Sequence, residues 1–176
     1  MCSAWIDVIT TDRLRLRPPQ PADAGRIAEL ANDAELAGMT AALPHPYALG
    51  DAQAWLSQQG DPASPERNFA IELGGEGLVG VVGFRPGDAG PWPELGYWIG
   101  RPYWGGGLAT EAVRSALVWA ERDWGRRAVT AGHFADNPAS ARVLEKAGFL
   151  YTGDRAPYRS LARREPAESR RMIWLA

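Results

Sequence analysis

Apolar and polar residues alternate in the first regular stretch of this chain. RLRLR, residues 13–17, places a leucine at every second position, which predicts a strand with one buried face. Two prolines end that strand, and Asp23 follows as the expected N-cap of a short helix, ADAGRIAELA. Residues 43–56 begin as a proline-containing loop and are predicted to become helical from about Gly50.

Three short apolar runs separated by turn signals come next, a pattern that favours antiparallel neighbours. They predict strands at residues 68–73, 78–84 and 94–100. After a glycine-rich stretch, a helix is predicted to end near Gly125, because apolar residues recur on one helical face. That face carries Val113, Leu117, Ala120 and Trp124.

The last part of the chain alternates strand, helix and strand again. RAVTAGHF (127–134) predicts a strand, and NPASARVLEKAGF (137–149) starts with a capping residue and ends near a glycine, as helices do. FLYTG and RMIWL predict two closing strands, separated by an arginine-rich loop at residues 154–170. This order of elements indicates an α/β fold with a mixed sheet.

Composition and charge narrow the classes of function. The chain has 176 residues and a net charge of −2, with a pI near 5.7. That length predicts a single domain spanning residues 1–176, and that charge offers no attraction to nucleic acid or to an anionic membrane. Cys2 is the single cysteine, and the sequence shows neither a secretory signal nor a membrane-spanning stretch, so we expect a cytoplasmic protein.

Three consecutive glycines stand directly before the predicted long helix. The first backbone N–H groups of a helix have no intrahelical partner and carry a partial positive charge. Glycines leave those groups open to an anion, which predicts a phosphate cradle made of backbone. An ordinary flexible turn is the alternative interpretation. The candidate cradle consists of Gly105, Gly106, Gly107, Leu108, Ala109 and Thr110.

Two other phosphate-binding loops fit these glycines poorly. A P-loop requires a lysine after its last glycine, and none follows here. A dinucleotide-binding fingerprint requires glycine or alanine where this chain has Thr110. It also requires a larger sheet than the roughly 70 remaining residues can build.

Four segments of the chain resemble one enzyme family. RPYWGGGLATEAV (101–113) is similar to the acyl-CoA-binding loop of GNAT N-acetyltransferases, [QR]xxGx[GA], and DNPASARVLEKAGF (136–149) to their second cofactor segment, NxxSxxxLEKxGF. TDRLRLRPPQPADA and ELGYWIG are similar to the branch that acetylates ribosomal-protein N-termini (RimJ/RimL-type). The resemblance runs from about residue 10 to the end, and it departs at Pro102, where Gln or Arg is usual.

The resemblance implies a fold and a reaction. The fold would be a single-domain GNAT fold, with a mixed, mostly antiparallel twisted sheet of about six to seven strands, about four flanking helices and splayed central strands. The reaction would move acetyl from acetyl-CoA to a primary amine, by direct attack and without a metal. The amine would belong to a protein or peptide N-terminus or to a small molecule. Relatives often form homodimers.

The resemblance also assigns cofactor-binding residues. Backbone groups on one strand would pair with the pantetheine arm, and backbone amides of the glycine loop would hold the diphosphate. Asn137 would bond a pantetheine amide, although it is equally suited to be only the N-cap of the last helix. The strand residues are Tyr97, Trp98 and Ile99, and the loop residues are those of the candidate cradle.

Acyl transfer from a thioester also needs a proton donor for the sulfur and a base for the amine. Ser140 resembles the residue that this branch uses to protonate or hydrogen-bond the leaving sulfur. Glu94 opens the central strand and is our candidate base, directly or through a water, and His133 is the alternative base. For each of them a purely structural role is the competing interpretation.

The acceptor is less well determined by the sequence. In the family, segments equivalent to residues 38–56 and 154–170 cover it, and the second of these is rich in arginine. A basic cover disfavours a multiply charged amine, although a solvated surface loop is the simpler interpretation. A non-catalytic acyl-CoA-binding module is the alternative function, and nucleotide binding without CoA is a third.

Overall fold

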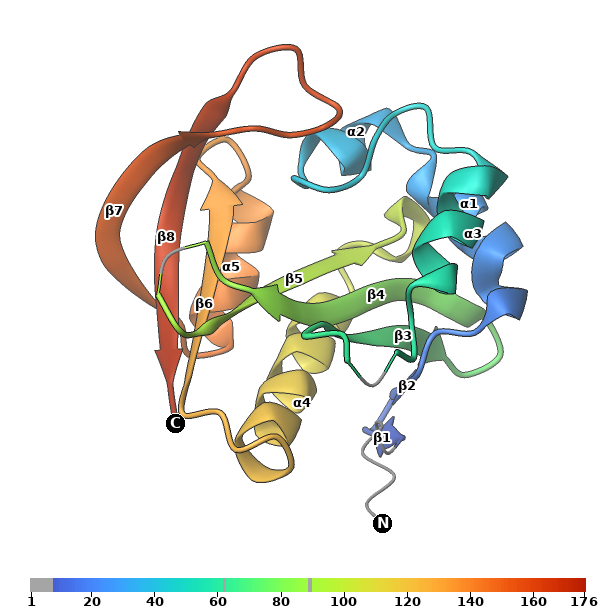
Figure 1. The fold of residues 1–176 in the computed structure, drawn as a ribbon, viewed down its shortest axis with the longest axis horizontal. Helices are drawn as coiled ribbons and strands as arrows, with labels where there is room; N and C mark the ends of the chain where they lie inside the picture. Colours follow the sequence, from blue (N-terminus) through green and yellow to red (C-terminus); the bar gives the residue numbers. More distant parts are fainter. Residues whose placement is uncertain (1–7, 62, 89) are drawn as a thin grey trace.

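One open, eight-stranded sheet organises the chain in the computed structural model, which describes residues 8–61, 63–88 and 90–176 (Figure 1). The strand order is β1-β2-β3-β4-β5-β6-β8-β7. The strands are β1 Ile9–Thr10, β2 Leu14–Arg17, β3 Arg67–Leu73, β4 Gly77–Pro86, β5 Pro93–Ile99, β6 Ala128–Phe134, β7 Leu150–Tyr158 and β8 Ala167–Leu175. The α-helices are α1 Ala24–Ala31, α2 Ala34–Gly38, α3 Leu49–Ser57, α4 Leu108–Arg122 and α5 Pro138–Lys146.

Neighbouring strands pair antiparallel everywhere in the described residues except between β5 and β6. The parallel pair is joined through the crossover helix α4, as parallel neighbours require. Its register holds one pair of residues, Glu94 opposite Thr130, and the two strands diverge beyond it. The predicted mixed, mostly antiparallel sheet with splayed central strands is therefore confirmed.

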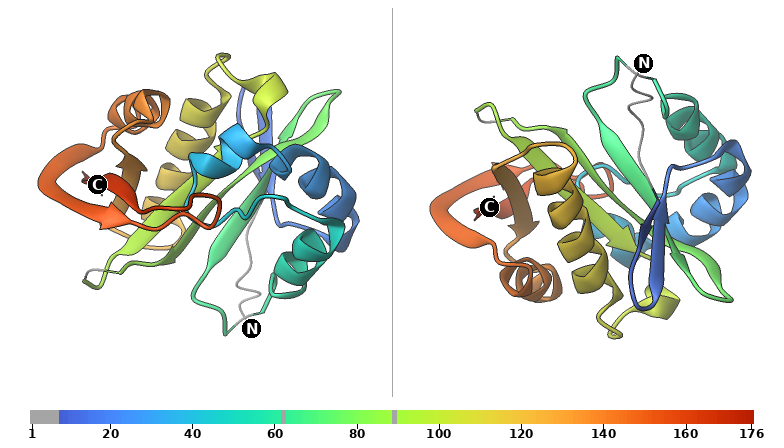
Figure 2. Two further views of the ribbon diagram at one scale, coloured as in Figure 1. Left: turned by 90° about the horizontal axis from the view of Figure 1, so that it is seen from above. Right: turned by 90° about the horizontal axis from the view of Figure 1, so that it is seen from below.

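Helices cover both faces of the sheet (Figure 2). α4 and α5 pack on one face, where Val113, Leu117 and Leu144 join Phe69 and Phe84 in the larger apolar core. α1, α2 and α3 pack on the other face around a second apolar cluster that contains Ile27, Leu30, Leu36 and Leu56. No helix in the described part of the chain is long and apolar enough to cross a membrane.

Two short elements raise the counts above the expected six to seven strands and four helices. β1 has two residues and α2 has five, so neither is long enough to show a periodic pattern in the sequence. α2 depends instead on its cap, since the Asp33 side chain accepts hydrogen bonds from the backbone N–H groups of Glu35 and Leu36.

The predicted loop at residues 154–170 is wrong at both ends. β7 continues to Tyr158 and β8 begins at Ala167, which leaves a connection of residues 159–166. β7 is an edge strand and is exposed along nearly its whole length, so it lacks the alternation of apolar residues that marks a half-buried strand. A register shift between Tyr151 and Arg155 interrupts the pattern further.

Asp23 does not cap α1 through its side chain. It ends a 3₁₀ turn that precedes the helix, and its buried carboxylate accepts two hydrogen bonds from Arg17 and one from the backbone N–H of Gln20. Burial alone would raise the pKa of Asp23, but these hydrogen bonds outweigh it and lower the pKa below its usual value. The Asp23 carboxylate, which the local sequence predicted to cap α1, is bound instead by Arg17 on the preceding strand.

Candidate active site

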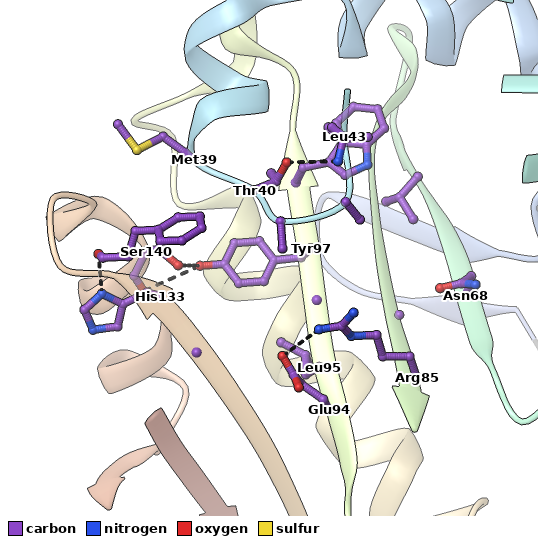
Figure 3. A pocket seen from close by; sticks show the side chains of 18 of the residues that line it. Met39, Thr40, Leu43, Asn68, Arg85, Glu94, Leu95, Tyr97, His133 and Ser140 are labelled. Atoms are coloured by element: carbon purple, nitrogen blue, oxygen red, sulfur yellow. Dashed lines mark hydrogen bonds and ion pairs between the residues drawn. The ribbon is translucent and has the colours of Figure 1, made fainter. Parts of the chain in front are cut away.

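A cavity of about 420 Å³ opens where β5 and β6 diverge (Figure 3). Side chains alternate across β5, so Leu95, Tyr97 and Ile99 pack with the α4 and α5 face, whereas Trp98 packs with the α1–α3 face. Glu94 and Gly96 alternate with Leu95 and Tyr97 in the same way, so they lie on the α1–α3 face with Trp98. A group held between the two strands can therefore be reached from both faces of the sheet, as it could not be in a paired sheet.

The glycine loop runs directly into α4 at the C-terminal end of β5. Gly107 is the N-cap of α4 with φ +77°, Gly105 has φ +80°, and both are exposed. These left-handed conformations favour glycine. No side chain caps α4, so its first amides point toward solvent, as an anion-binding helix terminus requires.

The N-terminal hairpin fastens this loop to the sheet. Arg13 on the turn before β2 donates to the carbonyl oxygen of Gly106 at 2.8 Å and to the carboxylate of Glu111 at 2.7 Å. Thr11 donates to the same carboxylate. Burial would raise the pKa of Glu111, but the hydrogen bonds from Thr11 and Arg13 outweigh it and lower the pKa. The glycine loop is thus anchored through a carbonyl oxygen, which leaves its backbone N–H groups uninvolved in this anchor.

Two hydroxyl groups meet across the gap between β5 and β6. The Tyr97 hydroxyl lies 2.8 Å from that of Ser140, which stands in the first turn of α5 (Figure 3). Burial raises the pKa of the Tyr97 phenol to about 12, and the hydrogen bond with Ser140 offsets only part of that rise. Both groups are therefore protonated near neutral pH and can donate.

Asn137 caps α5, because its side-chain oxygen accepts a hydrogen bond from the backbone N–H of Ser140 at 3.1 Å. Its side-chain nitrogen has no partner among residues 8–61, 63–88 and 90–176. The structural role that the sequence allowed is present, and a free donor remains beside Ser140.

Glu94 is buried and held by two arginines. One carboxylate oxygen accepts from Arg85 at 3.0 Å, and the other accepts from Arg171 at 3.1 Å. Tyr158 lies 2.9 Å from Arg85 and donates to Asp88, which completes a small ionic network at this end of the cavity. A carboxylate has about four lone-pair positions, so Glu94 keeps the capacity to accept from a water or an amine.

His133 is also buried, and both of its ring nitrogens are engaged. Nδ1 lies 2.8 Å from the carbonyl oxygen of Phe134, and Nε2 lies 3.0 Å from the hydroxyl of Tyr151 on β7. This arrangement ties β6 to the edge strand. It favours Glu94 over His133 as the group that remains available to an acceptor.

The two expected covers of the acceptor hold each other. Arg163, in the connection between β7 and β8, donates to the carbonyl oxygen of Gly38 at 2.6 Å and pairs with Asp136 at 2.8 Å. The backbone N–H of Leu161 donates to the carbonyl oxygen of Ala41 at 3.0 Å. The connection is therefore fastened to the segment after α2, which lines the cavity, and the charge of Arg163 is paired with the carboxylate of Asp136.

Sequence reasoning missed four contributors to the site. Arg85 and Arg171 lie far from Glu94 along the chain, and Arg13 lies far from the glycine loop, so only strand pairing brings these groups together. The sequence predicts a role only for the backbone of Tyr97, and nothing in ELGYWIG indicates that the Tyr97 hydroxyl reaches α5. The RLRLR pattern is the one signal in the sequence, because arginines that alternate with leucines on a strand require carboxylate partners on neighbouring elements.

The family model described as an acetyltransferase (GNAT) domain matches residues 13–150. That range covers well over half of the chain, and it includes the glycine loop, the splayed strands and α5. The chain therefore belongs to the GNAT acetyltransferase family.

Solved structures show the same fold. A GNAT-family acetyltransferase from Bacillus anthracis aligns with a TM-score of 0.81 at 21% identity, over 96% of this chain and 98% of its own. A spermidine N-acetyltransferase from Vibrio cholerae, solved with CoA and spermine, gives 0.78 at 19% over 94% and 96%. A structure described as a putative ribosomal-protein-serine acetyltransferase from the same species gives 0.75 at 18% over 97% and 98%.

One curated relative matches part of the sequence. It is the protein YkkB of Bacillus subtilis (strain 168), described as uncharacterized, and it is 41% identical over 61 residues. The match spans about a third of that relative's length, 34% of each chain. This match shows sequence similarity over one segment, and the description of the relative names no acceptor.

Proposed function

We propose that this chain transfers the acetyl group of acetyl-CoA to a primary amine of a peptide N-terminus or a small molecule, by direct attack. The observation that carries the proposal is the pair of hydroxyls, Tyr97 and Ser140, placed 2.8 Å apart in the gap between β5 and β6. They share one face of the sheet with α4, whose N-terminus has no side-chain cap. A protein that only bound an acyl-CoA would need the helix terminus but not two proton donors inside the gap.

The glycine loop would hold the diphosphate of the co-substrate. Its amides, from Gly105 to Thr110, lie at a helix N-terminus that no side chain caps. The edge of β5 that faces β6 has no strand partner beyond Glu94, so backbone groups among Tyr97–Ile99 can pair with the amides of pantetheine. The carbonyl oxygen of Ile99 is an exception, because it accepts a hydrogen bond from the Trp104 indole at 2.6 Å. The free side-chain nitrogen of Asn137 is suited to the same arm.

Arg13→Ala should raise the KM for acetyl-CoA about fivefold with little change in kcat, because one hydrogen bond that positions the loop is worth on the order of 1 kcal/mol. Steady-state kinetics with varied acetyl-CoA measures this. Arg15→Ala is the matched control, since Arg15 lies two residues further along the chain, on β2, and pairs with Glu72 rather than with the loop. An equal rise in KM in both variants would refute a positioning role for Arg13.

The chemistry follows from the two faces of β5. As the amine forms its bond to the acyl carbon and the carbon–sulfur bond breaks, Ser140 gives a proton to the sulfur. Tyr97 restores the proton of Ser140 through their hydrogen bond, and after CoA leaves Tyr97 regains a proton from solvent. Glu94, on the opposite face, takes the proton lost by the amine through an intervening water, and Arg85 and Arg171 fix its orientation.

The test of this function is release of CoA from acetyl-CoA with a panel of primary amines and peptides. At least one acceptor should release CoA, and Glu94→Gln should lower kcat for it by about 100-fold, the lower end of the effect of a general base. Glu121→Gln is the matched control, because Glu121 is exposed on α4 away from the cavity.

Three outcomes would overturn parts of the proposal. Binding of acetyl-CoA without release of CoA on any amine would support the non-catalytic acyl-CoA-binding module. Stabilisation by ATP or NAD but not by acetyl-CoA would support a nucleotide-binding protein. Unchanged turnover in both Glu94→Gln and Ser140→Ala would remove the assigned roles while leaving the reaction in place.

The location belongs to the same proposal. Cys2 is the single cysteine, so the chain cannot form an internal disulfide in an oxidising compartment. We place the protein in the cytoplasm on that ground.

A further inference from the structure

The acceptor side of the cavity is walled by apolar residues. The segment between α2 and α3 supplies one wall, α3 supplies a second, and β4 and β5 form the floor (Figure 3). A cavity of this size accommodates one small ligand or the first residue of a peptide. The apolar residues of the walls are Met39, Ala41, Ala42, Leu43, Pro44, Tyr47, Ala54 and Trp55.

The floor of the cavity is bare at one glycine, Gly96, because the Asn68 side chain lies where a Cβ on the neighbouring Gly83 would point. Gly83 on β4 and Gly96 on β5 are direct register partners, and both line the cavity. Gly96 is exposed although it lies in the middle of a central strand, and a Cβ added there would meet nothing within 4 Å. Its φ does not demand glycine. A glycine inside a strand weakens the strand and marks a place where a ligand approaches the backbone.

Charge in the cavity is balanced. The carboxylates that line it are Glu94 and Asp51, and the guanidinium groups are Arg85 and Arg171. Glu94 is paired with both arginines, and Asp51 accepts from the backbone N–H of Ala48. Within the described residues that line the cavity, no group of unpaired carboxylates stands ready for a second or third ammonium group.

We infer that the acceptor is a primary amine with one positive charge and an apolar group of several carbons next to it, and that Gly96 sets the size of that group. This inference rests on the proposed acetyl transfer. The amine would lie toward Glu94 and the gap, and the apolar group would lie over Gly96, beside the Asn68 side chain and under the wall of residues 39–44. A free alkyl or aryl amine and a peptide with a large apolar first residue share this chemistry.

The experiment compares kcat/KM for ethylamine, n-hexylamine, 2-phenylethylamine and spermidine at saturating acetyl-CoA. The kcat/KM for n-hexylamine and for 2-phenylethylamine should exceed that for ethylamine by at least about tenfold, since each added methylene in an apolar pocket can raise kcat/KM by about that factor. Both values should exceed that for spermidine as well. Two peptides, one beginning with Phe and one with Ser, distinguish a free amine from a peptide as the acceptor. A higher kcat/KM for the Phe peptide than for 2-phenylethylamine indicates a protein N-terminus.

Gly96→Ala tests the floor. The added methyl has room and should leave the fold intact, but it should lower the ratio of kcat/KM for 2-phenylethylamine to that for ethylamine about tenfold. Using the ratio cancels any loss common to both acceptors. Gly25→Ala on α1 is the matched control, because it makes the same change at an exposed position with nothing within 4 Å and outside the cavity.

The outcomes separate this inference from the reaction itself. Turnover that is equal for all the amines, or highest for spermidine, would overturn the inference and leave acetyl transfer standing. An unchanged ratio in Gly96→Ala would overturn the role of Gly96. Failure of every amine to release CoA would overturn the proposed function first, and the inference with it.

Discussion

Gly106→Glu should raise the KM for acetyl-CoA about 100-fold, equivalent to about 2.7 kcal/mol, because a carboxylate at the loop repels the diphosphate and competes for the amides of α4. Gly106 is exposed and does not have a positive φ, and the nearest atom to an added Cβ is 4.0 Å away. The side chain therefore enters without strain. Isothermal titration with CoA and steady-state kinetics measure the effect.

Gly74→Glu is the control for that variant. Gly74 lies in the turn between β3 and β4, is exposed, has no atom within 4 Å of an added Cβ and has no positive φ. This variant thus receives the same side chain and charge outside the glycine loop, and its affinity for CoA should equal that of the wild type. Wild-type affinity in Gly106→Glu would show that the diphosphate binds elsewhere.

Ser140→Ala should lower kcat about 100-fold and leave the KM for acetyl-CoA nearly unchanged, because general-acid help acts on the transition state. Tyr97→Phe should lower kcat less, and the double variant should be no slower than Ser140→Ala, because the two hydroxyls act as a unit. Ser57→Ala on α3, whose hydroxyl bonds only within its own helix, is the control.

The pH dependence of the reaction provides a second readout for this pair. Burial raises the pKa of Tyr97 to about 12, so the phenol stays protonated and kcat should show no alkaline decline from it below about pH 10. The same raised pKa makes stability depend on pH. The folded state holds this proton more tightly than the unfolded state, so the free energy of unfolding falls as pH rises from 10 toward 12. A fall in kcat near pH 8 in the wild type that is absent in Tyr97→Phe would contradict this.

Local pattern predicted the elements that carry a regular apolar face. α4 begins at Leu108 directly after the glycines, and its buried residues Val113, Leu117 and Ala120 are those that the helical face indicated. β3, β4, β5 and β6 lie within one or two residues of the predicted strands. These elements bury one side each, and burial imposes a period that can be read without partners.

Elements without such a face were missed or misplaced. β7 is exposed on both sides, α2 is shorter than two helical turns, and Asp23 turns to Arg17 rather than to the helix that follows it. Their partners lie on other elements: β8 pairs with β7, the connection of residues 159–166 bonds to the end of α2, and Arg17 on β2 bonds to Asp23. No local window contains those partners.

The amino-acid sequence by itself determined the order of strands and helices, the glycine-flanked helix terminus and the family, because each depends on spacing between neighbouring residues. Tertiary structure alone decided what surrounds the reacting groups: two arginines on Glu94, Tyr97 against Ser140, and an open glycine floor under apolar walls. The physical reason is that β5 parts from β6 after one register pair. That gap brings residues from six strands and three helices to one cavity, and no local pattern encodes it.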